Sequence, residues 1–463
     1  MIAVAVVVMV AGGLTACQSP LITKPTQGTA QTSAPPAPQP APQPARSDPI
    51  AEEAARTGLP SLIPFLTRVT GPLPEAEPAR PAEAPPLPPP TEARRVALLL
   101  PLSGSNGALG RAMLEAAEMA LFDFADTKFE LLIHDTQGTP EGAARAAEMA
   151  AGDGARLILG PLLAPSVRAV TPIARAGSMP VIAFSSNRAV AGGGIYTMGF
   201  FPEAEAARVT EYAVQRGHTR IAALAPDNSY GAAVVNALKV AADRQGAVVT
   251  RVQFYNPKAT DFSGVVQQIS DYGLRRQALQ NQVAELQGRT DEVALAAISR
   301  LKNLQTLGEL PFDALMLADG GRRLQAIAAL LPFYDVDPAK VQILGTGQWD
   351  EPGLGAEPAL LGGWFTAPPP EARASFSDRF AKAFGHDAPR LVTLAYDATA
   401  LAAVLARNPD GFNQAQLTQA GGFAGRDGIF RLLPTGVAER GLAVLRVDRR
   451  EARVLDPAPK AFP

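Results

Sequence analysis

The feature that most constrains the fold of this chain is a regular alternation of short apolar runs with longer amphipathic segments, which starts near residue 94. Val96 to Leu100 is a continuous apolar run that stops at Pro101, a pattern typical of a strand buried on both faces of a parallel sheet. The small residues Ser103 to Gly110 follow, and then a helical pattern. This order brings backbone N–H groups to the carboxyl end of a strand, where open α/β sheets bind ligands.

The alternation continues in two series, which predict two α/β lobes. The first series has strands at 129–133, 157–160 and 181–184 and helices at 109–125, 139–152 and 165–176. The second has strands at 221–225, 248–254, 314–317 and 342–344 and helices at 203–216, 229–245, 262–271 and 321–330. Such units form parallel sheets with right-handed connections. We expect each lobe to be a parallel sheet flanked by helices, with a ligand cleft between the lobes.

Composition argues against several functions. The formal net charge is −2, without a basic stripe, which argues against nucleic-acid binding. The only cysteine is Cys17, and His134, His218 and His386 show no metal-ligand spacing. We therefore expect no metal, no cofactor and no enzymatic activity. The weaker alternative is a hydrolase in which His134 is a base oriented by Asp135.

The N-terminus indicates the compartment. Ile2 to Val10 is apolar but too short to span a bilayer, and Leu14-Thr15-Ala16-Cys17 follows. These residues resemble the lipobox of bacterial lipoproteins, which implies a signal peptide over 1–17, a lipid on Cys17 and stable anchoring. By the resemblance to enterobacterial sorting, Gln18 after the cysteine favours the outer membrane. One departure is that no Lys or Arg precedes the apolar run.

Residues 18–92 are predicted to form a disordered tether. Pro20 to Pro90 holds 20 of the 43 prolines of the chain, interleaved with Ala, Gln and Thr. This composition buries too little apolar surface to fold. As extended polyproline II helix, the segment would reach about 200 Å, enough to carry a domain well across the periplasm.

Several motifs in the remaining chain resemble the type I periplasmic binding proteins, in particular the leucine/isoleucine/valine-binding branch. The matching motifs are Leu100-Pro101-Leu102-Ser103-Gly104, Leu159-Gly160-Pro161, Asp227-Asn228-Ser229-Tyr230-Gly231, Thr260-Asp261-Phe262 and Ala395-Tyr396-Asp397-Ala398. The resemblance covers about residues 94–456. It implies an α/β, two-lobed fold with three hinge crossovers, near Phe200, at Gly345 to Gly347 and within 428–447. Lobe 1 would then comprise 93–200 plus about 346–427 and lobe 2 would comprise 201–345 plus about 428–456, with a tail at 457–463.

The same resemblance implies a cleft for an amino-acid-like ligand. Small hydroxyl residues and backbone N–H groups would hold the ligand carboxylate, and an acid from the other lobe would hold the amine. The matching positions are Ser103, Gly104, Ser185, Ser186, Asn187 and Tyr230. Two departures weaken this grip, because Leu162 to Pro165 replaces a segment that carries Ser in relatives and Asn187 replaces Thr. The alternative is that Ser185 and Ser186 are ordinary turn residues.

Residues 272–312 form an insertion much longer than an ordinary loop. Leu279, Val283 and Leu286 share one helical face, and Thr290 is placed to cap a second helix that runs toward Gly308. We expect a helical hairpin on lobe 2 that recognises a partner; the alternative is that it packs on its own lobe.

An anchor, a tether, a binding-protein body, a weakened ligand grip and an insertion together resemble the penicillin-binding-protein activator lipoproteins. This resemblance implies a periplasm-facing lipoprotein that binds and activates a penicillin-binding protein, a peptidoglycan synthase. A departure is that no helical-repeat domain precedes the body. The alternative is the solute-binding protein of an ABC importer for branched-chain amino acids or similar small molecules.

Overall fold

The computed structural model of this chain describes residues 94–408 and 411–462. The predicted signal peptide, the lipobox with Cys17 and the tether 18–92 lie outside these residues. Among the residues described, no helix is both long enough and apolar enough to cross a bilayer.

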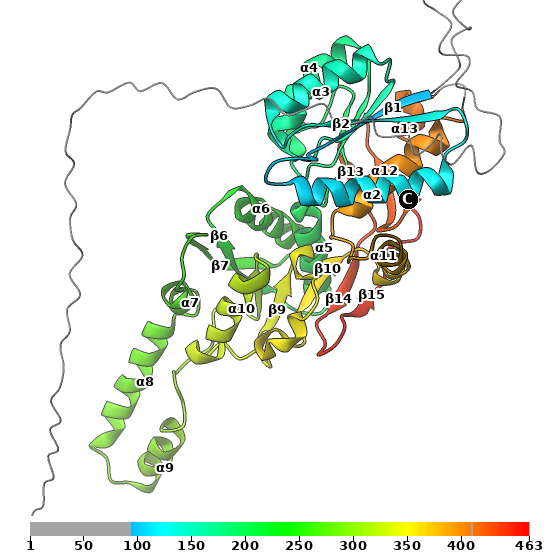
Figure 1. Cartoon of the computed structure of the whole chain (residues 1–463). Helices are drawn as coiled ribbons and strands as arrows, with labels where there is room; N and C mark the ends of the chain where they lie inside the picture. Colours follow the sequence, from blue (N-terminus) through cyan, green and yellow to red (C-terminus); the bar gives the residue numbers. More distant parts are fainter. Residues whose placement is uncertain (1–93, 409–410, 463) are drawn as a thin grey trace, which may run out of the picture. The chain divides into compact units, whose positions relative to one another are not determined.

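The first lobe contains a parallel sheet with the strand order β2-β1-β3-β4-β5 (Figure 1). Its elements are β1 (Arg94–Leu100), α2 (Gly107–Phe124), β2 (Phe129–Asp135), α3 (Pro140–Gly152), β3 (Leu157–Leu159), α4 (Ala164–Ala176), β4 (Val181–Ala183) and β5 (Ile195–Thr197). Alternate residues of β1 enter different cores. Val96, Leu98 and Leu100 pack in a cluster with α2, whereas Ala97 and Leu99 pack with α3 and α4. The predicted burial of this strand on both faces is confirmed.

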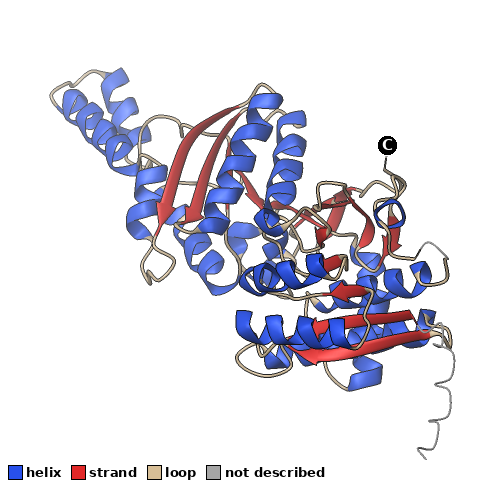
Figure 2. Ribbon diagram, turned by 90° about the horizontal axis from the view of Figure 1, so that it is seen from above, coloured by secondary structure: helices blue, strands red, loops and turns tan. Residues whose placement is uncertain are grey.

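The second lobe contains a sheet with the order β15-β14-β10-β9-β8-β6-β7. Figure 2 shows the strands in red with helices in blue on either side of them. Its elements are α5 (Pro202–Gln215), β6 (Arg220–Pro226), α6 (Ser229–Arg244), β7 (Val248–Tyr255), α7 (Ser263–Ile269), β8 (Ala314–Leu317), α10 (Gly321–Leu330), β9 (Gln342–Gly345), β10 (Trp364–Ala367), β14 (Ala443–Arg446) and β15 (Arg453–Asp456). Helices α5 and α6 pack on one face of the sheet, and α7 and α10 pack on the other. Strands β14 and β15 join antiparallel at one edge, while the others run parallel.

The chain between β10 and β14 returns to the first lobe. Its elements are α11 (Pro370–Phe384), α12 (Val392–Leu405), α13 (Gln414–Leu417) and a small antiparallel sheet of β11 (Phe423–Gly425), β12 (Gly428–Leu432) and β13 (Ala438–Arg440). Phe376 of α11, Tyr396 of α12 and Phe430 of β12 lie in the same buried cluster as Val96. Single-turn 3-10 helices occur at η2 (Arg188–Val190), η3 (Pro332–Tyr334), η4 (Gly347–Trp349), η5 (Leu354–Ala356) and η6 (Pro358–Leu360).

These positions differ from two of the lobe boundaries expected from the sequence. The expected lobe 1 segment 346–427 contains β10, which continues the second sheet instead. The expected lobe 2 segment 428–456 contains β12 and β13, which form the small sheet, and residues of both strands pack in the first lobe's core. Strand β10 is only the four residues Trp364–Ala367 and lies between irregular turns, so no periodic pattern marks it.

The described chain crosses between the lobes three times, at 198–201, 368–369 and 441–442. At these crossings, the ring of Phe200 lies 3.8 Å from the guanidinium of Arg390 and 4.8 Å from that of Arg440. Arg440 also lies over the ring of Phe430, at 5.4 Å, and donates to the carbonyl oxygen of Met198 at 2.9 Å. Cation–π contacts of desolvated arginines stabilise by about 2 kcal/mol. These contacts therefore tie the first and third crossings together.

Glu205, in the first turn of α5, is a buried acid beside the hinge. Its Oε2 accepts a hydrogen bond from the amide of Gly347 at 3.0 Å, and its carbonyl oxygen accepts one from the hydroxyl of Thr366 at 2.8 Å. Burial raises the pKa of Glu205 to about 7, although the Gly347 amide and the charge of Arg390 oppose the shift.

The insertion is a helical hairpin of α8 (Tyr272–Gln287) and α9 (Glu292–Leu301), as expected (Figure 1). The second helix is capped by Asp291, whose side chain accepts from the amide of Ala294 at 3.0 Å, and not by Thr290. Asp291 is one residue closer to the helix, so its carboxylate reaches the third amide of the first turn.

The hairpin is held to its lobe mainly at its base. Arg275 donates to the carboxylate of Asp335 at 2.6 Å, and the hydroxyl of Thr306 donates to the same carboxylate. Beyond the base, no residue of α8 is buried. Most of the hairpin surface therefore faces solvent.

We predict that Phe376→Ala destabilises the protein by about 3–5 kcal/mol, because it opens a cavity where α11 completes the first lobe's core. The measurement is urea unfolding followed by circular dichroism. Phe122→Ala is the control, since Phe122 is 88% exposed and should change stability by no more than about 0.5 kcal/mol. Equal effects of the two changes would contradict the proposed role of α11.

A second prediction concerns pH. The pKa of Glu205 is raised from 4.5 in the unfolded chain to about 7, so the unfolded chain loses this proton first. Folding stability from this group is therefore complete below pH 4.5 and falls as the pH rises to 7. Glu205→Gln keeps an acceptor for Gly347 and should raise stability at pH 8 by up to about 3 kcal/mol, with no gain at pH 4.

The measurement is the difference in unfolding free energy between Glu205→Gln and the unmodified protein across pH 4 to 8. Glu371→Gln, at an exposed glutamate, is the control for the substitution type. A pH-independent difference for Glu205→Gln would show that its carboxyl does not titrate in this range.

Candidate ligand-binding site

The loop after β1 carries the first predicted site residues, Ser103 and Gly104. The hydroxyl of Ser103 donates to Oδ2 of Asp135, the last residue of β2, at 2.6 Å. Oδ1 of Asp135 accepts from the amides of Leu102, at 2.9 Å, and Gln137, at 2.7 Å. Gly104 has a φ of 76°, and a Cβ there would lie 2.8 Å from the carbonyl oxygen of Gln137. A glycine is therefore needed for the two loops to meet.

Asp135 gives this edge of the first lobe a negative charge. Burial opposes ionisation, but the hydroxyl of Ser103 and the surrounding amides together lower the pKa of Asp135. Because the Ser103 hydroxyl already donates its one hydrogen bond to Asp135, the hydroxyl oxygen can only accept a further hydrogen bond. The expected grip of Ser103 on a ligand carboxylate does not match this geometry, which suits a ligand group that donates.

The loop after β4 carries Ser185, Ser186 and Asn187. Ser185 is buried, and its hydroxyl oxygen accepts from the amide of Asn187 at 3.1 Å. Oδ1 of Asn187 accepts from the amide of Ala189 and so caps η2, while Ser186 is exposed. Two of these side chains therefore have local structural partners. This loop and the Ser103 loop both follow the carboxyl ends of parallel strands in the same sheet, but β3 lies between β4 and β1.

The predicted lobe 2 residue, Tyr230, lies in the first turn of α6. Its hydroxyl is 2.7 Å from the hydroxyl of Thr346, which follows β9 and is fully buried. Burial raises the pKa of Tyr230 well above its ordinary value, so it stays a neutral phenol. Among the described residues, no hydrogen bond joins Tyr230 to the loops of the first lobe.

Sequence reasoning missed a buried polar cluster beside Tyr230. Asp319 follows β8 and accepts two hydrogen bonds from Arg323, at 2.8 and 3.0 Å, and one from the hydroxyl of Tyr255. Its carbonyl oxygen accepts from the indole of Trp349 at 3.1 Å. Asp319 could have been predicted as a site residue from the sequence, because it follows the carboxyl end of a predicted strand, as Ser103 does. Its charge is paired with Arg323 and is not free for a ligand amine.

The pair His134 and Asp135, proposed as the basis of a hydrolase, does not form. Successive residues of a strand point to opposite faces, and the carboxylate of Asp135 is bound to Ser103. Nε2 of His134 lies 3.5 Å from the carboxylate of Asp153 instead. The structure thus removes the geometric basis of that alternative.

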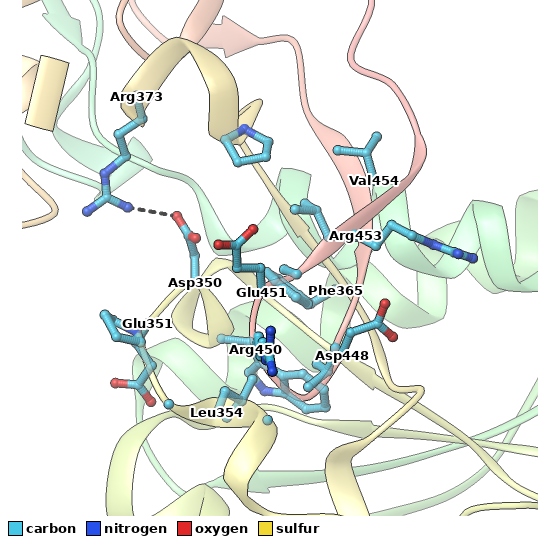
Figure 3. A pocket seen from close by; sticks show the side chains of 18 of the residues that line it. Asp350, Glu351, Leu354, Phe365, Arg373, Asp448, Arg450, Glu451, Arg453 and Val454 are labelled. Carbon is cyan, nitrogen blue, oxygen red and sulfur yellow. Dashed lines mark hydrogen bonds and ion pairs between the residues drawn. The ribbon is translucent and has the colours of Figure 1, made fainter. Parts of the chain in front are cut away.

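Charged residues link the two lobes beside a cavity of about 850 cubic ångström (Figure 3). Asp350, after η4 of the second lobe, accepts from Arg373 of α11 at 2.9 Å and lies 3.3 Å from Arg390. Arg390 also donates to Asp427 of the small sheet at 3.1 Å. Figure 3 shows the contact between Asp350 and Arg373 together with charged side chains of the β14–β15 turn. Trp349 and Phe365 are among the apolar residues that line the cavity. A hinge motion would have to rearrange these ion pairs.

The fold is shared with solved binding proteins. A putative branched-chain amino acid ABC transporter from Rhodospirillum rubrum has a TM-score of 0.64 at 18% identity, covering 78% of this chain and 100% of that one. An ABC transporter substrate-binding protein from Sphaerobacter thermophilus has a TM-score of 0.59 at 20% identity, covering 80% and 98%. A solute binding protein of an ABC transporter from Rhodopseudomonas palustris, in complex with 3,4-dihydroxy benzoic acid, has 0.55 at 16% identity, covering 80% and 97%.

The amino-acid sequence also identifies the family to which the chain belongs. No curated protein matches the chain. Residues 94–452, however, match the family described as periplasmic binding protein, which is most of the chain and includes both lobes and the hinge. The chain therefore belongs to the periplasmic binding protein family.

Proposed function

We propose that this protein is the solute-binding component of an ABC-type importer and takes a small molecule between its two lobes. The observation that carries this proposal is the pair of sheets whose carboxyl-end loops hold Ser103 on one lobe and Tyr230 on the other, joined by three crossings. Such hinged lobes close over a ligand when a few terminal residues absorb the rotation.

The polar groups suggest the kind of ligand. On the first lobe, the Ser103 hydroxyl donates to Asp135, so its oxygen is left to accept, and the carboxylate of Asp135 carries a negative charge. On the second lobe, Tyr230 and Thr346 share one hydrogen bond and keep further donor and acceptor capacity. A ligand with an ammonium group directed to Asp135 fits this arrangement, and branched-chain amino acids carry such a group. This orientation reverses the one implied by the family resemblance, in which the first lobe holds the carboxylate.

The family and the sequence of the N-terminus also support a location. We propose that the protein faces the periplasm and is anchored by lipid at Cys17, with the outer membrane favoured by Gln18.

A second candidate function, activation of a penicillin-binding protein, is favoured by one observation. The hairpin α8–α9 exposes large apolar side chains, with Leu274 at 74% and Val293 at 75% exposed. Large apolar side chains exposed on one projecting element favour a protein contact there. In this proposal the hairpin binds a peptidoglycan synthase, and the function does not require a ligand between the lobes.

For the first proposal, we predict that leucine, isoleucine or valine binds with micromolar affinity in titration calorimetry. Asp135→Asn keeps an oxygen for the amides of Leu102 and Gln137 but removes the charge, and should weaken binding about 10- to 100-fold. Asp243→Asn, at an exposed position of α6, is the matched control. Tighter binding by Asp135→Asn would refute the proposed orientation, and no heat with any of the amino acids would refute amino-acid binding.

For the second candidate, we predict that the double change Leu274→Glu and Val293→Glu abolishes capture of a peptidoglycan synthase from detergent-solubilised envelopes. The reason is that two charges would be buried unpaired at the contact. Val240→Glu, at a valine 51% exposed on α6, is the control and should leave capture unchanged. If the unmodified protein captures no synthase, or if the double variant captures it equally well, the hairpin is not the contact.

A further inference from the structure

The hairpin of α8 and α9 projects from the second lobe and buries little by its own packing (Figure 1, Figure 2). Helix α8 has no buried residue, and Ala294 is the one buried residue of α9. Helices of this length are marginal in water without tertiary packing. A side of the hairpin that carries exposed apolar residues would therefore gain stability from a further contact.

One side of the hairpin presents a row of residues from each helix. The rows are Leu274, Ala278 and Glu285 on α8 and Val293, Ala296 and Arg300 on α9, and all six residues are exposed. Each of them precedes a less exposed residue of its helix by one position, which is a rotation of about 100°. Because the two helices are antiparallel, the same rotation away from the contact line brings both rows to the same side of the hairpin. We call this side the hairpin face.

The hairpin face combines apolar side chains with opposite charges at its two ends. Leu274 is 74% exposed and Val293 is 75% exposed. Glu285 lies near the tip of the hairpin, whereas Arg300 lies toward its base. Within residues 94–408 and 411–462, no ion pair involves Glu285 or Arg300. The face therefore has an acidic end and a basic end, and both charges are available to a partner.

Such a face is complementary to a copy of itself turned end to end. Two-fold symmetric dimers pair the same surface of both subunits. In an antiparallel arrangement, Glu285 of each copy approaches Arg300 of the other copy, whereas a parallel arrangement brings like charges together. We propose that two copies of this chain dimerise through the hairpin face, as an antiparallel four-helix bundle that buries Leu274 and Val293.

The size of the hairpin face fits a weak dimer. A helix of 16 residues, the length of α8, is about 24 Å long. Two packed helices are about 20 Å wide, so two such faces would bury about 1,000 square ångström in total. This area is near the lower limit for a specific interface, and we expect a dissociation constant in the micromolar range. The dimer does not depend on the ligand cleft, but it would cover the residues that the second candidate function assigns to a synthase.

Sedimentation velocity of the full chain, from about 1 to 200 μM, tests for the dimer. Glu285→Arg and Arg300→Glu should each weaken dimerisation about tenfold, because both symmetry-related charge pairs become repulsive. An equimolar mixture of the two variants should associate at least as tightly as the unmodified chain, since opposite charges then meet at both ends. This recovery would also show that both variants fold. Glu148→Arg, at an exposed glutamate of α3, is the control and should not change dimerisation.

A second pair of variants tests the apolar contacts. Leu274→Glu should abolish the dimer below about 200 μM, because unpaired charges would be buried in the bundle. Leu295→Glu is the matched control, since Leu295 is also an exposed leucine of the hairpin, at 57%. It lies two residues after Val293 on α9, a rotation of about 200°, and therefore on the opposite side. This variant should dimerise like the unmodified chain.

A chain that stays monomeric at every concentration overturns the proposal, even if it binds an amino acid and so retains the proposed cleft function. A dimer that neither the charge reversals nor Leu274→Glu weakens forms elsewhere, which also overturns it. Disruption by Leu295→Glu alone would place the contact on the other side of the hairpin and overturn the assigned face. If a monomer captures a synthase through Leu274 and Val293, the face binds that partner and not a second copy.

Discussion

The first lobe depends on a constraint of the chain order, because its central strand is buried on both faces. Helices α3 and α4 cover one face of β1 and follow it closely in sequence. The other face needs α12 as well as α2, and α12 begins only at Val392, after the whole second sheet up to β10 has been built. Leaving the apolar face of the sheet exposed to water would cost about 25 cal/mol of folding free energy per square ångström. The chain must therefore return to the first lobe, and its last strands must then cross once more.

The crossings concentrate charge in a region with little water. Arg390 and Arg440 contact the ring of Phe200, and Asp427 and Glu205 are buried nearby. Burying charges costs free energy unless partners compensate it. Compensation here comes from ion pairs such as Arg390 with Asp350, which belongs to the other lobe. A change of lobe angle would therefore have to break or exchange these partly buried ion pairs.

The sequence predicted well what depends on local periodicity, such as β1, β6 and the helices that follow them. It failed for β5 and β10, which are short and are defined by pairing with neighbours rather than by their own pattern. It placed the cap of α9 on Thr290 because either residue suits the position, and only the backbone geometry selects Asp291. The candidate site residues were named from the family resemblance, and their places after strands could be read from the sequence. Their hydrogen-bond partners could not be predicted from the sequence. Ser103 contacts Asp135 only because β1 and β2 pair in a register that places the ends of the two strands side by side.

Two acids of the first lobe illustrate how hydrogen-bond partners and burial set the charge of a carboxylate. The carboxylate of Asp135 accepts bonds from Leu102, Ser103 and Gln137, and its pKa is lowered, so its charge is stabilised and orders the loop whether or not a ligand is present. Asp397 accepts one hydrogen bond, from the amide of Arg426, and burial raises its pKa to about 7 although Arg440 and Arg426 oppose the shift. Asp135 therefore keeps its negative charge at neutral pH, whereas Asp397 takes up or releases a proton near pH 7.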